Sequence, residues 1–227
     1  MTRTRVRPFG HLDRSSSGRR RRSRGQAMVE YAIIVPAFVL LLMGMLEFGF
    51  VFNHNLNLEY ATREGARTGA ALANGGTSNC PVAGSTDGAS ITNPDIDAYI
   101  IAAVQRVLTS PGSPIDITQV STVKIWKNDP ANPGTPISGE INTWTNTGAG
   151  SGPTVDGVAL TFTQSSRNWH VCERNNSNVP PDSIGVSISY TYKMITPLAA
   201  VLKFFGPGGV ATLPMSDQTV MALNPTN

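Results

Sequence analysis

Residues 25–52 have the sequence GQAMVEYAIIVPAFVLLLMGMLEFGFVF, in which Glu30 and Glu47 are the only charged side chains. The apolar part, Ala27–Phe52, would span about 39 Å as an α-helix rising 1.5 Å per residue. That exceeds the roughly 30 Å hydrocarbon core of a bilayer, so both carboxylates can lie near headgroup levels. We therefore predict a transmembrane helix over residues 26–52.

The charge distribution predicts how this helix is oriented. Residues 1–25 carry nine Arg and one Asp, whereas the other 202 residues carry nine basic and fourteen acidic side chains. By the positive-inside rule, residues 1–25 form an Arg-rich cytoplasmic leader and the C-terminal part lies outside the membrane. The apolar run is too long for a cleaved secretory signal peptide, so the span is predicted to be retained. Because the positive charge lies in the leader, a basic nucleic-acid-binding surface is not expected.

The helix is predicted to extend beyond the span over residues 53–73, since no proline interrupts them. Pro36 should cause a mild kink within the span. Small residues at every fourth position form a ridge on the helix. Such a ridge would let another helix approach closely. The ridge consists of Ala61, Gly65, Gly69 and Ala73. The alternative is that the two glycines only weaken a surface helix. For Glu47, an interfacial position and a helix–helix contact are equally compatible with the sequence.

Glu30 is a carboxylate at the start of an apolar segment, where an ionisable group is expensive and marks function by default. If the mature chain began at Gln26, its α-amine would lie one helical turn from Glu30. That amine could then neutralise the Glu30 of a neighbouring subunit packed alongside. The alternative is an interfacial carboxylate that extends to the cytoplasmic headgroups in an unprocessed chain.

Gly25 followed by Gln26-Ala27-Met28-Val29-Glu30-Tyr31 resembles the cleavage site of type IV prepilins, in the Glu-Tyr form of Flp-type prepilins. Together with Leu46-Glu47-Phe48-Gly49 and the segment ATREGARTGA at 61–70, it resembles the TadE-like family, the minor pilins or pseudopilins of tight-adherence (Tad) systems. The resemblance implies cleavage after Gly25 by a prepilin peptidase. It also implies other pilins or pseudopilins, the Tad assembly platform and the membrane as partners. A major Flp pilin is very short, so the length of this chain favours a minor subunit.

The remainder is predicted to be an α+β extracytoplasmic domain over residues 95–227, joined by a Gly- and Ser-rich linker over 74–94. Hydrophobic periodicity gives the elements of a small antiparallel sheet and its helices. They are a helix over 95–108, strands over 115–126 and 184–192, a short helix over 197–205 and a last strand over 210–222. Residues 128–153, which are polar and rich in Pro and Gly, are predicted to be a surface loop.

Cys80 and Cys172 are the only cysteines, and both lie beyond the predicted span. In an extracytoplasmic domain such a pair is most simply a disulfide. Closing a loop of about 92 residues would contribute roughly 4–5 kcal/mol in the chain-entropy model. The alternative is two unpaired, buried thiols.

No enzyme chemistry is predicted, and neither a cofactor nor a metal. His170, Cys172 and Glu173 are too few for a zinc site. Asp95 and Asp97 resemble a carboxylate pair but are equally explained by a helix N-terminus. The sequence favours a single-pass TadE-like minor pilin in a bacterial cytoplasmic membrane, which takes part in assembling a Tad pilus for adhesion or secretion. Incorporation into the pilus and retention in the membrane platform are equally compatible with the sequence. The alternative is an uncleaved, signal-anchored surface domain that binds a ligand through loops bearing Trp126, Trp144 and Trp169.

Overall fold

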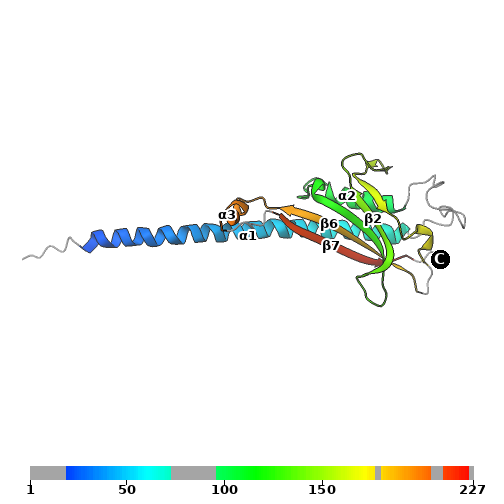
Figure 1. The fold of residues 1–227 in the computed structure, drawn as a ribbon, viewed down its shortest axis with the longest axis horizontal. Coiled ribbons are helices and arrows are strands. Elements are labelled where there is room, and N and C mark those ends of the chain that lie inside the picture. Colours follow the sequence, from blue (N-terminus) through cyan, green and yellow to red (C-terminus); the bar gives the residue numbers. More distant parts are fainter. Residues whose placement is uncertain (1–18, 73–95, 177–179, 206–211, 225–227) are drawn as a thin grey trace, which may run out of the picture. The chain divides into compact units, whose positions relative to one another are not determined.

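The structure is a computed structural model that describes residues 19–72, 96–176, 180–205 and 212–224. Helix α1, Arg19–Leu72, is continuous over 54 residues and contains Pro36 (Figure 1). The chain divides into two compact units, Met1–Met45 and Leu46–Asn227, so that α1 belongs to both. The predicted extension of the apolar helix beyond Phe52 is confirmed as far as Leu72.

The C-terminal unit contains a five-stranded antiparallel sheet with strand order β5-β2-β1-β6-β7 (Figure 1). Its strands are β1 (Val120–Asn128), β2 (Pro136–Asn146), β5 (Phe162–Ser166), β6 (Ser183–Lys193) and β7 (Thr212–Ala222). The sheet confirms the predicted α+β class and its antiparallel pairing.

Short elements connect the strands. They are the 3₁₀ turns η2 (Ile117–Gln119) and η3 (Val171–Glu173), the hairpin of β3 (Thr154–Val155) and β4 (Val158–Ala159), and helix α3 (Leu198–Phe205). The hairpin turn places Asp156 and Gly157 at positive φ, which a two-residue type I′ turn requires. The strand predicted over 115–126 begins at Val120, later than expected. The reason is the η2 turn before it, in which the Asp116 side chain accepts a hydrogen bond from the Thr118 amide.

The prediction of a surface loop over residues 128–153 is wrong, because β2 occupies Pro136–Asn146 between β1 and β5. Seven of its eleven residues are Ser, Gly, Glu, Asn or Thr, so the strand lacks the apolar alternation by which strands are found. Its two fully buried residues are Asn142 and Trp144. Pairing with neighbours on both sides, rather than hydrophobicity, determines this strand.

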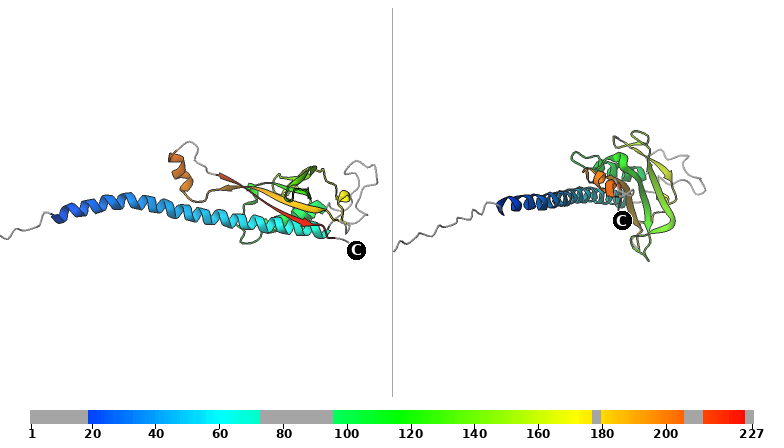
Figure 2. Two further views of the ribbon diagram at one scale, coloured as in Figure 1. Left: turned by 90° about the horizontal axis from the view of Figure 1, so that it is seen from below. Right: turned by 60° about the vertical axis from the view of Figure 1, so that its left-hand side comes forward.

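The core lies between the sheet, helix α2 (Ile96–Leu108) and the C-terminal half of α1 (Figure 2). α2 contributes Ile100, Ile101, Val104 and Leu108, each completely buried. These apolar residues recur at three- and four-residue intervals, which gives the helix one inward face. Two ion pairs, Glu59 with Arg63 and Glu64 with Arg67, form on α1 in the same unit.

The three tryptophans are all buried. Trp144 and Trp169 belong to the core, and Trp126 lies over Gly185 of the adjacent strand β6. A Cβ atom at Gly185 would come within 2.3 Å of the Trp126 ring, so only glycine leaves room for it. The tryptophans therefore do not form an exposed binding surface.

Candidate assembly site

The predicted processing segment lies on the exposed surface of α1. Gly25, Gln26, Glu30 and Tyr31 are all exposed, and nothing lies within 4 Å of a Cβ atom built on Gly25. In the single chain, the side-chain amide of Gln26 donates a 3.1 Å hydrogen bond to the Glu30 carboxylate. Both Glu30 and the bond before Gln26 are thus accessible to another protein.

Beyond Glu30 the helix presents large apolar side chains on its surface. Met28 is 77% exposed and Ile33 is 70% exposed, and Pro36 is also exposed. Among the described residues, one helix, Gly25–Leu72, is long and apolar enough to cross a membrane, with a mean hydropathy of 2.3 in its most apolar window. An apolar surface of this size needs lipid or other helices to cover it, which suggests membrane anchoring.

From Leu46 onward α1 turns a different set of residues toward its own domain. Ala61 is completely buried, and Gly65 and Gly69 lie against α2 and β6. A Cβ atom would come within 2.6 Å of Val104 at Gly65 and within 2.7 Å of Ile184 at Gly69. The small-residue ridge therefore allows close packing inside one chain; Ala73, its last predicted member, lies outside the described residues.

Glu47 is buried, with 4% of its surface exposed, although it lies in an apolar stretch of helix. Its carboxylate accepts hydrogen bonds from the Tyr192 hydroxyl and from the backbone amides of Ile195, at 3.1 Å, and Thr196, at 3.0 Å. Glu47 thus binds the end of β6 and the segment that leads to α3. This contact with the sheet was not among the sequence expectations, and the interfacial position of Glu47 stays a prediction.

Two further polar residues of α1 face the sheet at similar spacing. The His54 ring stacks on Tyr190 with ring centroids 5.7 Å apart, and its Nδ1 lies 3.0 Å from the Tyr190 hydroxyl. The Tyr190 hydroxyl donates its single proton to Gln119. The Nδ1–H group of His54 is therefore the donor to the Tyr190 hydroxyl oxygen. The hydroxyl of Thr62 lies within hydrogen-bonding distance of Asp217 and Thr219 on β7.

The buried position of the two tyrosines alters their acidity. Burial raises the pKa of Tyr190 to about 12. Burial, together with the hydrogen bond to Glu47, raises the pKa of Tyr192 still further. Both hydroxyls therefore stay protonated over the physiological range, as a donor to a carboxylate must.

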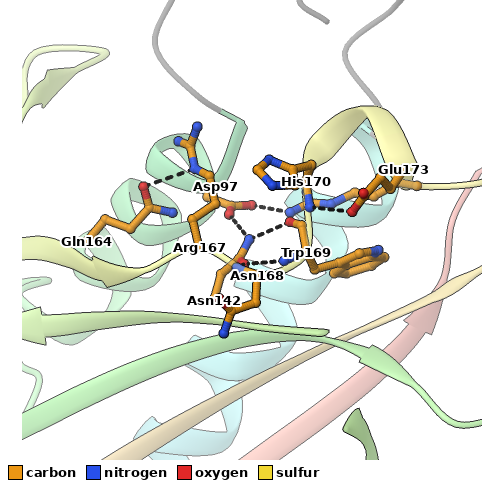
Figure 3. Close-up of polar contacts among 9 residues, drawn as sticks. Asp97, Asn142, Gln164, Arg167, Asn168, Trp169, His170 and Glu173 are labelled. Atoms are coloured by element: carbon orange, nitrogen blue, oxygen red, sulfur yellow. Dashed lines mark hydrogen bonds and ion pairs between the residues drawn. The ribbon is translucent and has the colours of Figure 1, made fainter. Parts of the chain in front are cut away.

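A second buried polar cluster joins α2, β2 and the segment before η3 (Figure 3). Asp97 forms an ion pair with Arg174, and both side chains are completely buried. Asn142 donates to Asp97 at 2.6 Å and accepts from the Trp169 amide at 2.8 Å, while the Arg174 guanidinium lies 4.5 Å from the centroid of the Trp169 ring. Asp97 is thus neutralised by Arg174, and Asp95 lies outside the described residues.

The segment beside this cluster is held by a helix cap. The His170 amide donates to Glu173 at 3.1 Å, in the capping box of η3. In the described ranges, no group of three or more His, Cys, Asp or Glu side chains could hold a metal ion. Cys80 lies outside the described residues, so its pairing with Cys172 stays a prediction.

Sequence reasoning missed the partners on the sheet, Tyr190, Tyr192 and Asp217, as well as Arg174 and Asn142. The signal for one of these contacts was present, because Glu47 interrupts an apolar stretch of helix and a buried carboxylate needs polar partners. The identity of the partners depends on tertiary structure.

Comparison with known proteins gives one family. The model of the family described as TadE-like protein matches residues 25–67, from the predicted cleavage site to the small-residue ridge. No curated protein and no solved structure matches the chain. Over residues 25–67, the predicted similarity to the TadE-like family is therefore confirmed.

Proposed function

We propose that this protein is a TadE-like minor pilin or pseudopilin that takes part in assembling a Tad (Flp-type) pilus for adhesion or secretion. The observation that carries the proposal is the family match over residues 25–67, which begins at Gly25. The match includes the exposed apolar part of α1 and the part that packs under the sheet. The first part offers a surface for lipid and other pilins, and the second attaches a folded domain to it.

The proposed topology places residues 1–25 in the cytoplasm, residues 26–52 in the bacterial cytoplasmic membrane and the domain outside. Nine arginines in the leader and an uncharged stretch between Glu30 and Glu47 support it. The proposed domain bounds within the outer part are 53–73, 74–94 and 95–227. The Tad assembly platform and other pilins would meet the protein in this membrane.

A prepilin peptidase would cleave between Gly25 and Gln26. Both residues are exposed, and the Gln26 side chain already hydrogen bonds to Glu30. Cleavage would replace an ordinary peptide nitrogen with a cationic amine close to that carboxylate. In a packed assembly, this amine would pair with the Glu30 of a neighbouring subunit and fix the axial register.

Intact-mass analysis of membrane-extracted protein tests the processing step. In cells with an active prepilin peptidase, the wild-type chain should begin at Gln26. Gly25→Ala should be processed almost normally, whereas Gly25→Phe should keep its leader, because a bulky side chain at this position would obstruct access to the bond before Gln26. A wild-type chain that keeps its leader when the peptidase is active would contradict the proposal. Cells with an inactive peptidase provide the control.

The proposal that the protein binds a ligand through tryptophan-bearing loops finds no support, since all three tryptophans are buried. The buried Asp97–Arg174 pair and the capping role of His170 likewise favour a structural protein over an enzyme.

A further inference from the structure

Helix α3, Leu198–Phe205, has an apolar sequence, and its described side chains are exposed or half-buried. Its sequence is LAAVLKFF, in which Lys203 is the single charged residue. Ala200 and Lys203 are exposed, and Ile195, just before the helix, is 61% exposed. In Figure 2, α3 projects beyond the end of the sheet. The large exposed side chain of Ile195, next to an apolar helix, is therefore a candidate contact with a further apolar surface.

The beginning of α3 is held at a defined level of α1. The Glu47 carboxylate accepts hydrogen bonds from the amides of Ile195 and Thr196, and the Thr196 hydroxyl oxygen lies 3.4 Å from the Leu198 amide nitrogen. The hydrogen bond from Tyr192 holds the end of β6 at the same carboxylate. The segment entering α3 is therefore fixed beside Glu47.

The level of Glu47 corresponds to the outer edge of the predicted span. A helix rises about 26 Å from Glu30 to Glu47 at 1.5 Å per residue, close to the roughly 30 Å hydrocarbon thickness. With Glu30 at the cytoplasmic headgroups, Glu47 comes to the opposite headgroup region. Phe48 is 71% exposed and Phe52 is 56% exposed, so the apolar surface of α1 continues at the level of α3.

We infer that α3 and Ile195 lie in the outer headgroup–acyl boundary of the lipid bilayer, as an interfacial helix. Its apolar side chains would cover acyl chains and Lys203 would face the headgroup phosphates, the usual arrangement of such helices. The inference rests on the proposed membrane anchoring, and it identifies a second lipid contact besides the span. Lipid is favoured over a second copy of the chain because α3 begins beside Glu47, which lies near the outer end of the predicted span along α1.

Tryptophan fluorescence in lipid discs tests the inference with the full-length chain. I195W and the control A131W, in the exposed turn between β1 and β2, are reconstituted singly into phosphatidylcholine–phosphatidylglycerol discs. Lipids brominated in the upper acyl chain should quench the fluorescence added by I195W several-fold more than that added by A131W. The three native tryptophans are buried and are subtracted with the wild type.

Equal quenching of the two variants would overturn the inference. It would also be overturned if I195W were shielded only in discs that hold two chains, since the occupant would then be a second copy. Co-flotation of the wild type with vesicles tests membrane anchoring independently. A chain that floats but shows no quenching contradicts this inference alone, whereas a chain that does not float contradicts the proposed function.

A charge on the helix provides a second measurement. Ala200→Glu places a carboxylate three residues before Lys203, which supports a helix while opposing insertion. Tryptic cleavage after Lys203 in vesicles should become several-fold faster in this variant, whereas Ala131→Glu should leave it unchanged. Cleavage equally fast in the wild type and in Ala200→Glu would contradict the lipid contact.

Discussion

The hydroxyl of Tyr192, at the end of β6, donates a hydrogen bond to the buried carboxylate of Glu47 on α1, 145 residues earlier in the chain. The two backbone amides that follow the strand donate to the same carboxylate. Glu47, which lies in the segment that matches the family, thus holds the C-terminal end of β6.

Removing one side of this contact should destabilise the domain. Tyr192→Phe removes the hydroxyl, and Glu47→Gln removes the charge that the amides stabilise; each should cost about 1–3 kcal/mol of unfolding free energy. A double-mutant cycle on the detergent-solubilised chain measures the coupling between them. Additive effects would show that the two side chains do not interact. Glu59→Gln, which alters a half-buried carboxylate paired with the exposed Arg63 on the same helix, is the control and should cost less than about 1 kcal/mol.

Gly65→Ala should destabilise the packing of α1 against α2. The added methyl would come within 2.6 Å of Val104 and 3.3 Å of Val186. Overpacking costs about 1–3 kcal/mol, which exceeds the gain of roughly 1 kcal/mol in helix propensity. Gly49→Ala is the matched control, because nothing lies within 4 Å of its added methyl. Thermal melts of the two variants should shift in opposite directions or differ by several degrees, and equal shifts would contradict the prediction.

Arg174→Ala should be among the most damaging single changes in the domain. It leaves the carboxylate of Asp97 buried without its cation, a change that costs about 3–5 kcal/mol. The double variant Arg174→Met with Asp97→Asn removes both charges and should recover much of that loss. Denaturant unfolding monitored by the buried tryptophans measures it. Failure of the double variant to recover any stability would indicate that the hydrogen bonds of Asn142, rather than the ion pair, dominate.

Lowering the pH should remove the stability that the Asp116 carboxylate contributes at the η2 turn. Hydrogen bonds from the side chain and amide of Thr118 lower the pKa of Asp116 below its ordinary value of about 3.9. A lowered pKa in the folded state means that the contribution is complete above that ordinary value and is lost as the pH falls through the folded-state pKa. The difference in melting temperature between the wild type and Asp116→Asn should therefore shrink below about pH 4. A difference independent of pH would exclude the carboxylate charge as its cause.

Sequence patterns predicted the elements whose burial is periodic. Apolar spacing identified α2, and strict alternation from Ile184 to Tyr192 identified β6, because each buries one face of a regular element. Strand β2 escaped because its position depends on pairing with β1 and β5, and its polar residues carry no alternation. The residues 25–67 carried enough local pattern for the family to be predicted.

The polar partners of α1 could not be predicted from local sequence. Glu47 and Tyr192 are far apart in the chain, and either could have faced water or lipid. The Tyr192 hydroxyl can donate to the Glu47 carboxylate only because the fold places the sheet against this part of α1. Asp97 shows the same limit. An acidic residue at a helix N-terminus needs no further partner, and only the fold places Arg174 beside it.

Glu47, His54 and Thr62 recur about two turns apart on one side of α1, and each bonds a different point on β6 or β7. Axial sliding or rolling of the helix beneath the sheet would have to break all three contacts together. A force along α1 would therefore load them in parallel, as in shear, instead of peeling them away one at a time. Such an attachment resists traction along the helix better than the same three contacts would if they were broken one after another.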